Sequence, residues 1–233
     1  MSSVINVSQV HYPESDGKPM GETDLHRDQM VRHIELLKHY YRNQRVYVSG
    51  DLLVYYEQGN PKRFIVPDAF VAKGINPKRR RIYKIWFEGK PPDVIIETTS
   101  KKTKRKDTID KPRLYAQLGV KEYFMVDPEQ DYLDPALQGY RLVGSIYRRI
   151  VADETGSLVS EELGLKLRLE DDGLVFYRLD TGERLLTADE RADRESEGRR
   201  AEAEARRAEA EGRRAAESEL ARLREEVAKR PKA

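Results

Sequence analysis

The sequence of 233 residues predicts a mixed α/β domain, a sheet flanked by helices, followed by a long charged C-terminal helix. Two observations support this prediction. In the first 186 residues, a segment with helical spacing of apolar residues is followed by short apolar segments typical of strands. From Thr187 onward, 26 of 47 residues are charged and none is aromatic, so this part cannot form a hydrophobic core. We expect an N-terminal arm at 1–20, an α/β domain at 21–186 and a helical tail at 187–233.

The composition excludes several classes of protein. No apolar run approaches the roughly 20 residues that span a bilayer, and the N-terminus lacks the pattern of a secretory signal. The absence of cysteine excludes disulfides and thiolate zinc sites and fits a reducing compartment. We therefore expect a cytoplasmic protein that does not bind a membrane.

The first regular element should be an amphipathic helix that begins at Thr23 or Asp24 and extends to about Asn43. Apolar side chains recur along it at close to the helical period, which predicts a buried face. These side chains are Leu25, Met30, Ile34, Leu37 and Tyr41.

Strand-like segments follow. Residues 46–56 alternate partly and are interrupted by Gly50, a candidate bulge, and residues 64–72 form a second segment. Residues 91–100 and 122–128 have near-continuous apolar centres, typical of strands buried on both faces.

A second helix should end at Leu118, before Gly119, and begin at Asp107 or, because Pro112 fits only a first turn, near Asp110. Four shorter strand candidates between residues 140 and 186 predict a peripheral extension of the same domain.

The tail contains the near-repeat AEAEARR and AEAEGRR at 201–214, and its alternating charges favour a helix. The seven-residue period is compatible with a coiled coil, but alanine and glycine make a weak seam, so a solvated single helix fits as well. A homo-oligomer, such as a dimer, would form through this helix if it is a coiled coil.

Two carboxylates interrupt apolar strands: Asp68 within FIVPDAFVA and Glu97 within PPDVIIETTS. A buried charge is costly unless it is paired or binds a metal. Adjacent strands would bring the two side chains close enough to share one divalent cation. Oxygen ligands favour Mg²⁺ or Mn²⁺ over zinc.

Asp93 is the alternative to Asp68, because it also follows a proline. It shares a strand face with Glu97, but four residues along a strand separate them by roughly 13 Å. The two cannot share a metal, so we expect Asp93 to begin its strand or to hold a turn.

Six segments between residues 12 and 143 occur in an order that resembles the PD-(D/E)XK nucleases. They are YPESDGKPMGETDLH, VYVSGDLLVYYEQGNP, VPDAFVAKG, PPDVIIETTS, DTIDKPRLYAQLGVKEYFMVDP and LQGYRLV. More specifically, the chain resembles the restriction endonuclease family often called Uma-two. The resemblance implies a restriction-endonuclease-like fold and metal-dependent cleavage of DNA.

The resemblance also implies roles for particular residues. Thr99 stands where the superfamily has its lysine, and the following helix should supply that lysine as Lys111. Rival lysines lie in the loop at Lys101, Lys102 and Lys104. Asp68, Glu97 and the carbonyl of Thr98 would hold the cation, and Lys111 would orient the attacking water. Glu22 and His26 match accessory positions, although Glu22 could equally be a helix-capping acid.

Two basic segments flank the carboxylate strands in sequence and suit contacts to DNA phosphates. They are Lys78, Arg79, Arg80 and Arg81, and Lys101, Lys102, Lys104 and Arg105.

The sequence thus supports a Mg²⁺-dependent DNA endonuclease. The alternative is a catalytically inactive nuclease-like module that binds DNA or protein and oligomerises through its C-terminal helix.

Overall fold

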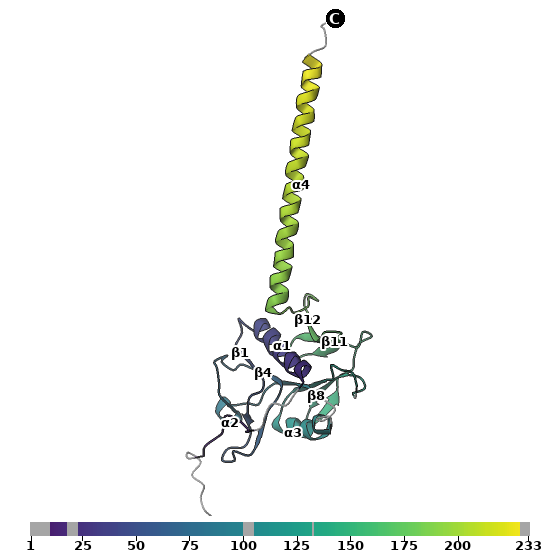
Figure 1. Ribbon diagram of the computed structural model, residues 1–233. Helices are drawn as coiled ribbons and strands as arrows, with labels where there is room; N and C mark the ends of the chain where they lie inside the picture. The colour runs from purple at the N-terminus through teal and green to yellow at the C-terminus, as the bar shows by residue number, and fades with distance from the viewer. Residues whose placement is uncertain (1–9, 18–22, 100–104, 132, 229–233) are drawn as a thin grey trace, which may run out of the picture. The chain divides into compact units, whose positions relative to one another are not determined.

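The computed structural model describes residues 10–17, 23–99, 105–131 and 133–228. It divides into two compact units, residues 1–185 and residues 186–233, which are described separately. The first unit contains all the strands, and the second is a long helix (Figure 1).

A six-stranded mixed sheet forms the centre of the first unit, which confirms the predicted fold class. Its strand order is β1-β4-β6-β7-β8-β9, and only β6 and β7 are parallel. The strands are β1 Val46–Ser49, β4 Ala69–Lys73, β6 Val94–Thr98, β7 Glu122–Val126, β8 Leu137–Val143 and β9 Ile146–Arg149.

Both faces of this sheet are covered, which explains the near-continuous apolar strands. Ile96 and Phe124 belong to a core cluster with residues of helix α1 (Asp24–Tyr40) and of the three-stranded sheet β10-β11-β12. Ile95 and Tyr123 alternate with them and belong to a second cluster with Tyr115 from helix α3 (Lys111–Leu118). The bounds of the small sheet are β10 Leu158–Ser160, β11 Leu165–Glu170 and β12 Gly173–Arg178.

Helix α1 runs from Asp24 to Tyr40, and the hydroxyl of Thr23 caps it by accepting a hydrogen bond from the His26 amide (3.2 Å). Met30 and Leu37 are buried as expected. The prediction for Leu25 is wrong, because its side chain is 40% exposed. The buried side of the first turns is instead occupied by the polar residues His26 and Gln29.

The segment at residues 64–72 is two strands rather than one. Strand β3 (Phe64–Ile65) pairs with β2 (Val54–Tyr55), which also pairs with β5 (Tyr83–Lys84) in a separate sheet. The short helix α2 (Ile85–Glu88) follows β5.

The described part of the N-terminal arm, residues 10–17, is irregular and packs on the β3-β2-β5 sheet. The Tyr12 and Tyr55 rings meet edge to face at 5.0 Å between centroids, and the Tyr55 hydroxyl donates to the carbonyl of Pro13 (2.7 Å).

Before the second helix, the chain forms a π-helical segment, η2, at Lys106–Asp110. Helix α3 then runs from Lys111 to Leu118 and ends at Gly119 with φ 84°. Pro112 lies in its first turn, where the missing amide costs nothing. The helix therefore begins at the later of the two predicted starts.

The second unit is helix α4 (Ala188–Ala228), whose side chains from Ala201 to Arg222 are exposed. Ion pairs one turn apart support it, including Arg199–Glu195 (2.8 Å) and Arg206–Glu202 (2.6 Å). None of the helices in the described residues combines the length and apolar character needed to cross a bilayer.

Candidate active site

Asp68 and Glu97 lie side by side at the ends of two adjacent strands. Strands β4 and β6 are antiparallel with Ala69 opposite Ile96, and one further step places Asp68 opposite Glu97. The amide of Asp68 donates weakly to Oε2 of Glu97 (3.4 Å). The structure thus brings together the two carboxylates that the sequence singled out.

Two other groups fix the Asp68 carboxylate. Its Oδ2 accepts a hydrogen bond from the Thr98 amide (2.8 Å) and lies 3.1 Å from Nε2 of His26. Because side chains alternate along a strand, Thr98 directs its side chain to the face opposite Glu97. Only its main chain is therefore placed beside the carboxylates.

Glu97 is fully buried and is held from helix α3. The Tyr115 hydroxyl donates to Oε1 (2.6 Å), and Nζ of Lys111 lies 3.0 Å from Oε2. The ammonium of Lys111 also pairs with Oδ1 of Asp107 (2.7 Å), and the Lys111 side chain is 27% exposed. Asp107, Lys111 and Tyr115 are spaced by four residues, so one face of η2 and α3 carries all three.

The charges in this cluster do not balance. The carboxylates of Asp68, Glu97 and Asp107 lie near one ammonium, that of Lys111. Burial raises the pKa of Glu97 to about 8; Lys111 opposes the rise, while Asp68 and Asp107 add to it. Burial tends to lower the pKa of Lys111, but Glu97 and Asp107 together raise it above its usual value, so the ammonium keeps its proton.

These residues fit a divalent cation. Three carboxyl groups lie near one ammonium at the site, and carboxylate oxygens are hard donors of the kind that Mg²⁺ and Mn²⁺ prefer. Within the described residues, no group of three or more His, Cys, Asp or Glu side chains is arranged to hold a metal. The set of Asp68, Glu97 and the main chain of Thr98 suits Mg²⁺, which usually keeps several waters beside one or two carboxylates.

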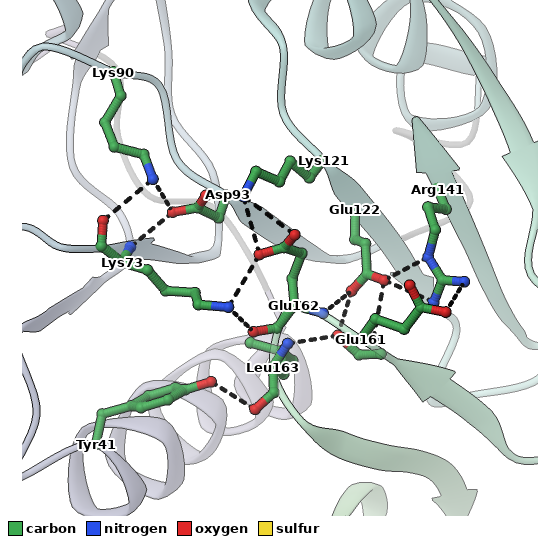
Figure 2. A network of polar contacts seen from close by, with 11 residues as sticks. Tyr41, Lys73, Lys90, Asp93, Lys121, Glu122, Arg141, Glu161, Glu162 and Leu163 are labelled. Carbon is green, nitrogen blue, oxygen red and sulfur yellow. Dashed lines mark hydrogen bonds and ion pairs between the residues drawn. The ribbon is translucent and has the colours of Figure 1, made fainter. Parts of the chain in front are cut away.

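Asp93, the alternative carboxylate, lies in a different environment. Its buried side chain accepts from the Lys73 amide (2.7 Å) and pairs with Lys90 (2.5 Å) and Lys121 (3.1 Å), as Figure 2 shows. Asp93 lies in a bend directly before β6, so it is not part of the strand.

The network around Asp93 continues through Glu162 to a second buried acid, Glu122, which pairs with Arg141 (2.9 Å; Figure 2). Four bases and four acids form its ion pairs, so its formal charges balance. The bases are Lys73, Lys90, Lys121 and Arg141, and the acids are Asp93, Glu122, Glu161 and Glu162. The network connects β10 to the large sheet and has no excess charge to attract a cation.

The four residues of the first basic segment, 78–81, lie in different environments. Arg80 does not fit the phosphate contact predicted for it, because its side chain is 5% exposed, pairs with Glu88 (2.7 Å) and stacks on Tyr47. Arg81 is exposed but pairs with Glu14 (3.0 Å). Lys78 and Arg79 remain candidates for phosphate contacts, since Lys78 is exposed and Arg79 carries no carboxylate partner among the described residues.

In the second basic segment, Arg105 is exposed. Lys101, Lys102, Lys104 and the accessory residue Glu22 lie outside the described residues.

Asp107 and Tyr115 contact the site, although the sequence predicts no functional role for either. Asp107 is expected only as a helix cap, and Tyr115 only as part of the second helix. Their four-residue spacing around Lys111 is the signal that could have found them, because it puts all three on one helical face.

The mixed sheet with its flanking helices has the restriction-endonuclease-like fold class that the sequence predicts. The chain belongs to the family whose model is described as Uma2, putative restriction endonuclease, which matches residues 8–175.

Comparison with solved structures finds a crystal structure described as a putative nuclease belonging to DUF820 from Anabaena variabilis. It is 13% identical, with a TM-score of 0.47, and the match covers 67% of this chain and 87% of that chain. Comparison with curated proteins finds no match.

Proposed function

We propose that this chain is a metal-dependent DNA endonuclease that hydrolyses phosphodiester bonds. The observation that carries the proposal is the unbalanced cluster of Asp68, Glu97 and Lys111, together with membership of the restriction endonuclease family. Mg²⁺ or Mn²⁺ is the proposed cofactor, and DNA is the proposed substrate.

The proposed ligands are Asp68, Glu97 and the carbonyl of Thr98. A cation bound there would polarise a phosphate oxygen and lower the pKa of a coordinated water. His26 holds the Asp68 carboxylate in place, and Tyr115 does the same for Glu97. Such contacts restrict the rotamers of ligands and commonly affect metal affinity.

Lys111 is proposed to assist catalysis as a cation. Its raised pKa keeps the ammonium charged, so it is suited to orient water and stabilise negative charge on the phosphate rather than to accept a proton. Asp107 provides Lys111 with a second anionic partner that is independent of Glu97. Lys111 would therefore keep its ion pair with Asp107 if Glu97 bound a metal.

The test is nicking of supercoiled plasmid DNA by the full chain with Mg²⁺ or Mn²⁺. We expect Asp68→Asn, Glu97→Gln and Lys111→Met each to lower the rate at least about 100-fold, the magnitude usual when an electrostatic contact to the transition state is removed. Asp93→Asn is the matched control, since it changes a buried carboxylate next to the same strand and should retain cleavage while folded.

Equal cleavage by the wild type and the three site variants would place the activity elsewhere. Absence of cleavage by the wild type with either metal would favour the alternative, a catalytically inactive module that binds DNA or protein.

A further inference from the structure

A pocket of about 330 Å³ lies beside β1, an edge strand of the large sheet. The end of α1 and the residues just after it contribute Lys38 and Arg42 to its lining, and the loop before β5 contributes Lys78 and Arg79. No acidic residue lines the pocket among the described residues. The cations therefore come from two segments that are far apart in sequence.

These four cations differ from the two arginines that follow them in the chain, Arg80 and Arg81. Across the described residues, no carboxylate forms an ion pair with any of the four, whereas neighbouring Arg80 and Arg81 both have acidic partners. Arg42 donates to the carbonyl of His39 (3.0 Å), which orients the guanidinium without neutralising it. Uncompensated charges converging on one pocket create a positive potential that attracts anions.

The pocket lies close to the candidate active site. Ser49 lines it and pairs with Phe70, two residues after Asp68. The next residue, Gly50, is so close to the Asp68 carbonyl that an added Cβ would lie 1.8 Å from that oxygen. Only strand β4 lies between β1 and β6. Two strand spacings correspond to about 10 Å across the sheet, from β1, which carries Ser49, to β6, which carries Glu97.

We propose that this pocket binds the phosphodiester backbone of the nucleic acid a few nucleotides from the cleaved phosphate. The inference deepens the proposed function and rests on it for the position of the cleaved phosphate. At a rise of about 3.4 Å per nucleotide, a backbone leaving the site reaches β1 within a few nucleotides. The pocket volume is at the low end of small-ligand sites and suits one sugar–phosphate unit.

The test measures binding of a fluorescent 20-base-pair DNA duplex by the full chain in EDTA, as a function of salt. Each phosphate contact contributes about 0.9 to the slope of log affinity against log salt concentration. Because the pocket holds one phosphate, we expect Lys38→Gln/Arg42→Gln and Lys78→Gln/Arg79→Gln each to reduce the slope by about 0.9. At 0.1 M salt, loss of this phosphate contact should make each double variant bind about eightfold more weakly than the wild type.

The control is Arg148→Gln/Arg149→Gln, which removes the same charge from exposed residues of β9, the opposite edge strand. Its slope should stay within about 0.5 of the wild-type slope. Equal slopes for all four proteins, or an equal reduction in the control, would overturn the proposal. Binding of polyglutamate, but not DNA, through the same residues would assign the pocket to an acidic protein partner and overturn it as well.

The two proposals fail in distinguishable ways, because binding in EDTA does not depend on cleavage. A chain that shows the predicted slopes but nicks no plasmid with Mg²⁺ or Mn²⁺ has the pocket without the proposed activity. A chain that nicks plasmid but shows unchanged slopes has the activity without the pocket.

Discussion

Asp93 and Glu97 are both buried, Asp93 just before strand β6 and Glu97 within it, but the charges around them differ. Asp93 lies among lysine nitrogens within a balanced network, and these contacts outweigh its burial to lower its pKa. Glu97 shares a single lysine with Asp107 and has a raised pKa. The first environment stabilises a charge that is already present, whereas in the second a metal cation would take the place of the proton that Glu97 keeps.

Because the pKa of Glu97 rises from 4.5 to about 8 on folding, the metal-free protein should lose stability with increasing pH. Between these values the folded protein keeps a proton that the unfolded chain releases, so the free energy of unfolding falls as pH rises. Glu97→Gln removes this dependence. Its melting temperature in EDTA should match the wild type near pH 5 and exceed it at pH 8.

Asp93→Asn is the counterpart, and it should lower the melting temperature because it leaves Lys90 and Lys121 without their shared partner. A Glu97→Gln variant that is less stable than the wild type at pH 8 would contradict the raised pKa of Glu97, because it would show that folding stabilises the ionised carboxylate.

The burial of His33 predicts that stability changes with pH in the opposite direction. His33 is fully buried, neither ring nitrogen has a hydrogen-bond partner among the described residues, and burial lowers its pKa from 6.5 to about 4. Between these values the unfolded chain binds a proton that the folded protein does not, so stability falls on acidification. His33→Leu should resist urea better than the wild type at pH 5. An equal decrease in stability from pH 7 to pH 5 in both proteins would contradict this.

At the scale of elements, the close contact of β1 with the start of β4 positions Asp68. Gly50 follows β1, and the carbonyl of Asp68 lies where its Cβ would be. The sequence suggested a bulge at Gly50, but the structure requires glycine there because two backbones approach closely.

Gly50→Ala should therefore displace Asp68, lower stability by about 1–3 kcal/mol, as overpacking usually does, and reduce cleavage. The measurements are urea unfolding and plasmid nicking. Gly198→Ala is the control, because nothing lies within 4 Å of its added methyl group. Full activity and stability in Gly50→Ala would show that the close approach at Gly50 does not position the site.

Local chemistry explains which elements could be predicted from the sequence. Pro112 and Gly119 define the limits of α3, and the apolar run around Glu97 defines a buried strand, because these signals act within a few residues. The division of residues 64–72 between two sheets depends on distant pairing partners, and so does the strand β10. Arg80 resembles its neighbours in sequence, and only the fold brings Glu88 from α2 close enough to neutralise it.

At the scale of the whole molecule, the buried clusters lie entirely within residues 1–185, whereas α4 contributes no buried residue among those described. The domain should therefore fold without the tail. A chain that ends at Leu186 should melt within about 2 °C of the full protein, measured by circular dichroism. A much lower melting temperature would show that the tail supports the domain.

Oligomerisation through α4 remains a prediction, and light scattering on the same two proteins tests it. We expect the full chain to have the mass of a dimer and the truncated chain that of a monomer. Equal masses per chain would remove α4 from any assembly.

The proposed function requires that Asp68 and Glu97 together hold the divalent cation. The most direct measurement is binding of Mn²⁺ to the full chain, monitored by the decrease in the electron paramagnetic resonance signal of free Mn²⁺. We predict saturable binding by the wild type and by Asp93→Asn, and at least about tenfold weaker binding by Asp68→Asn and Glu97→Gln. Equal Mn²⁺ affinity in all four proteins would contradict the assignment of the site.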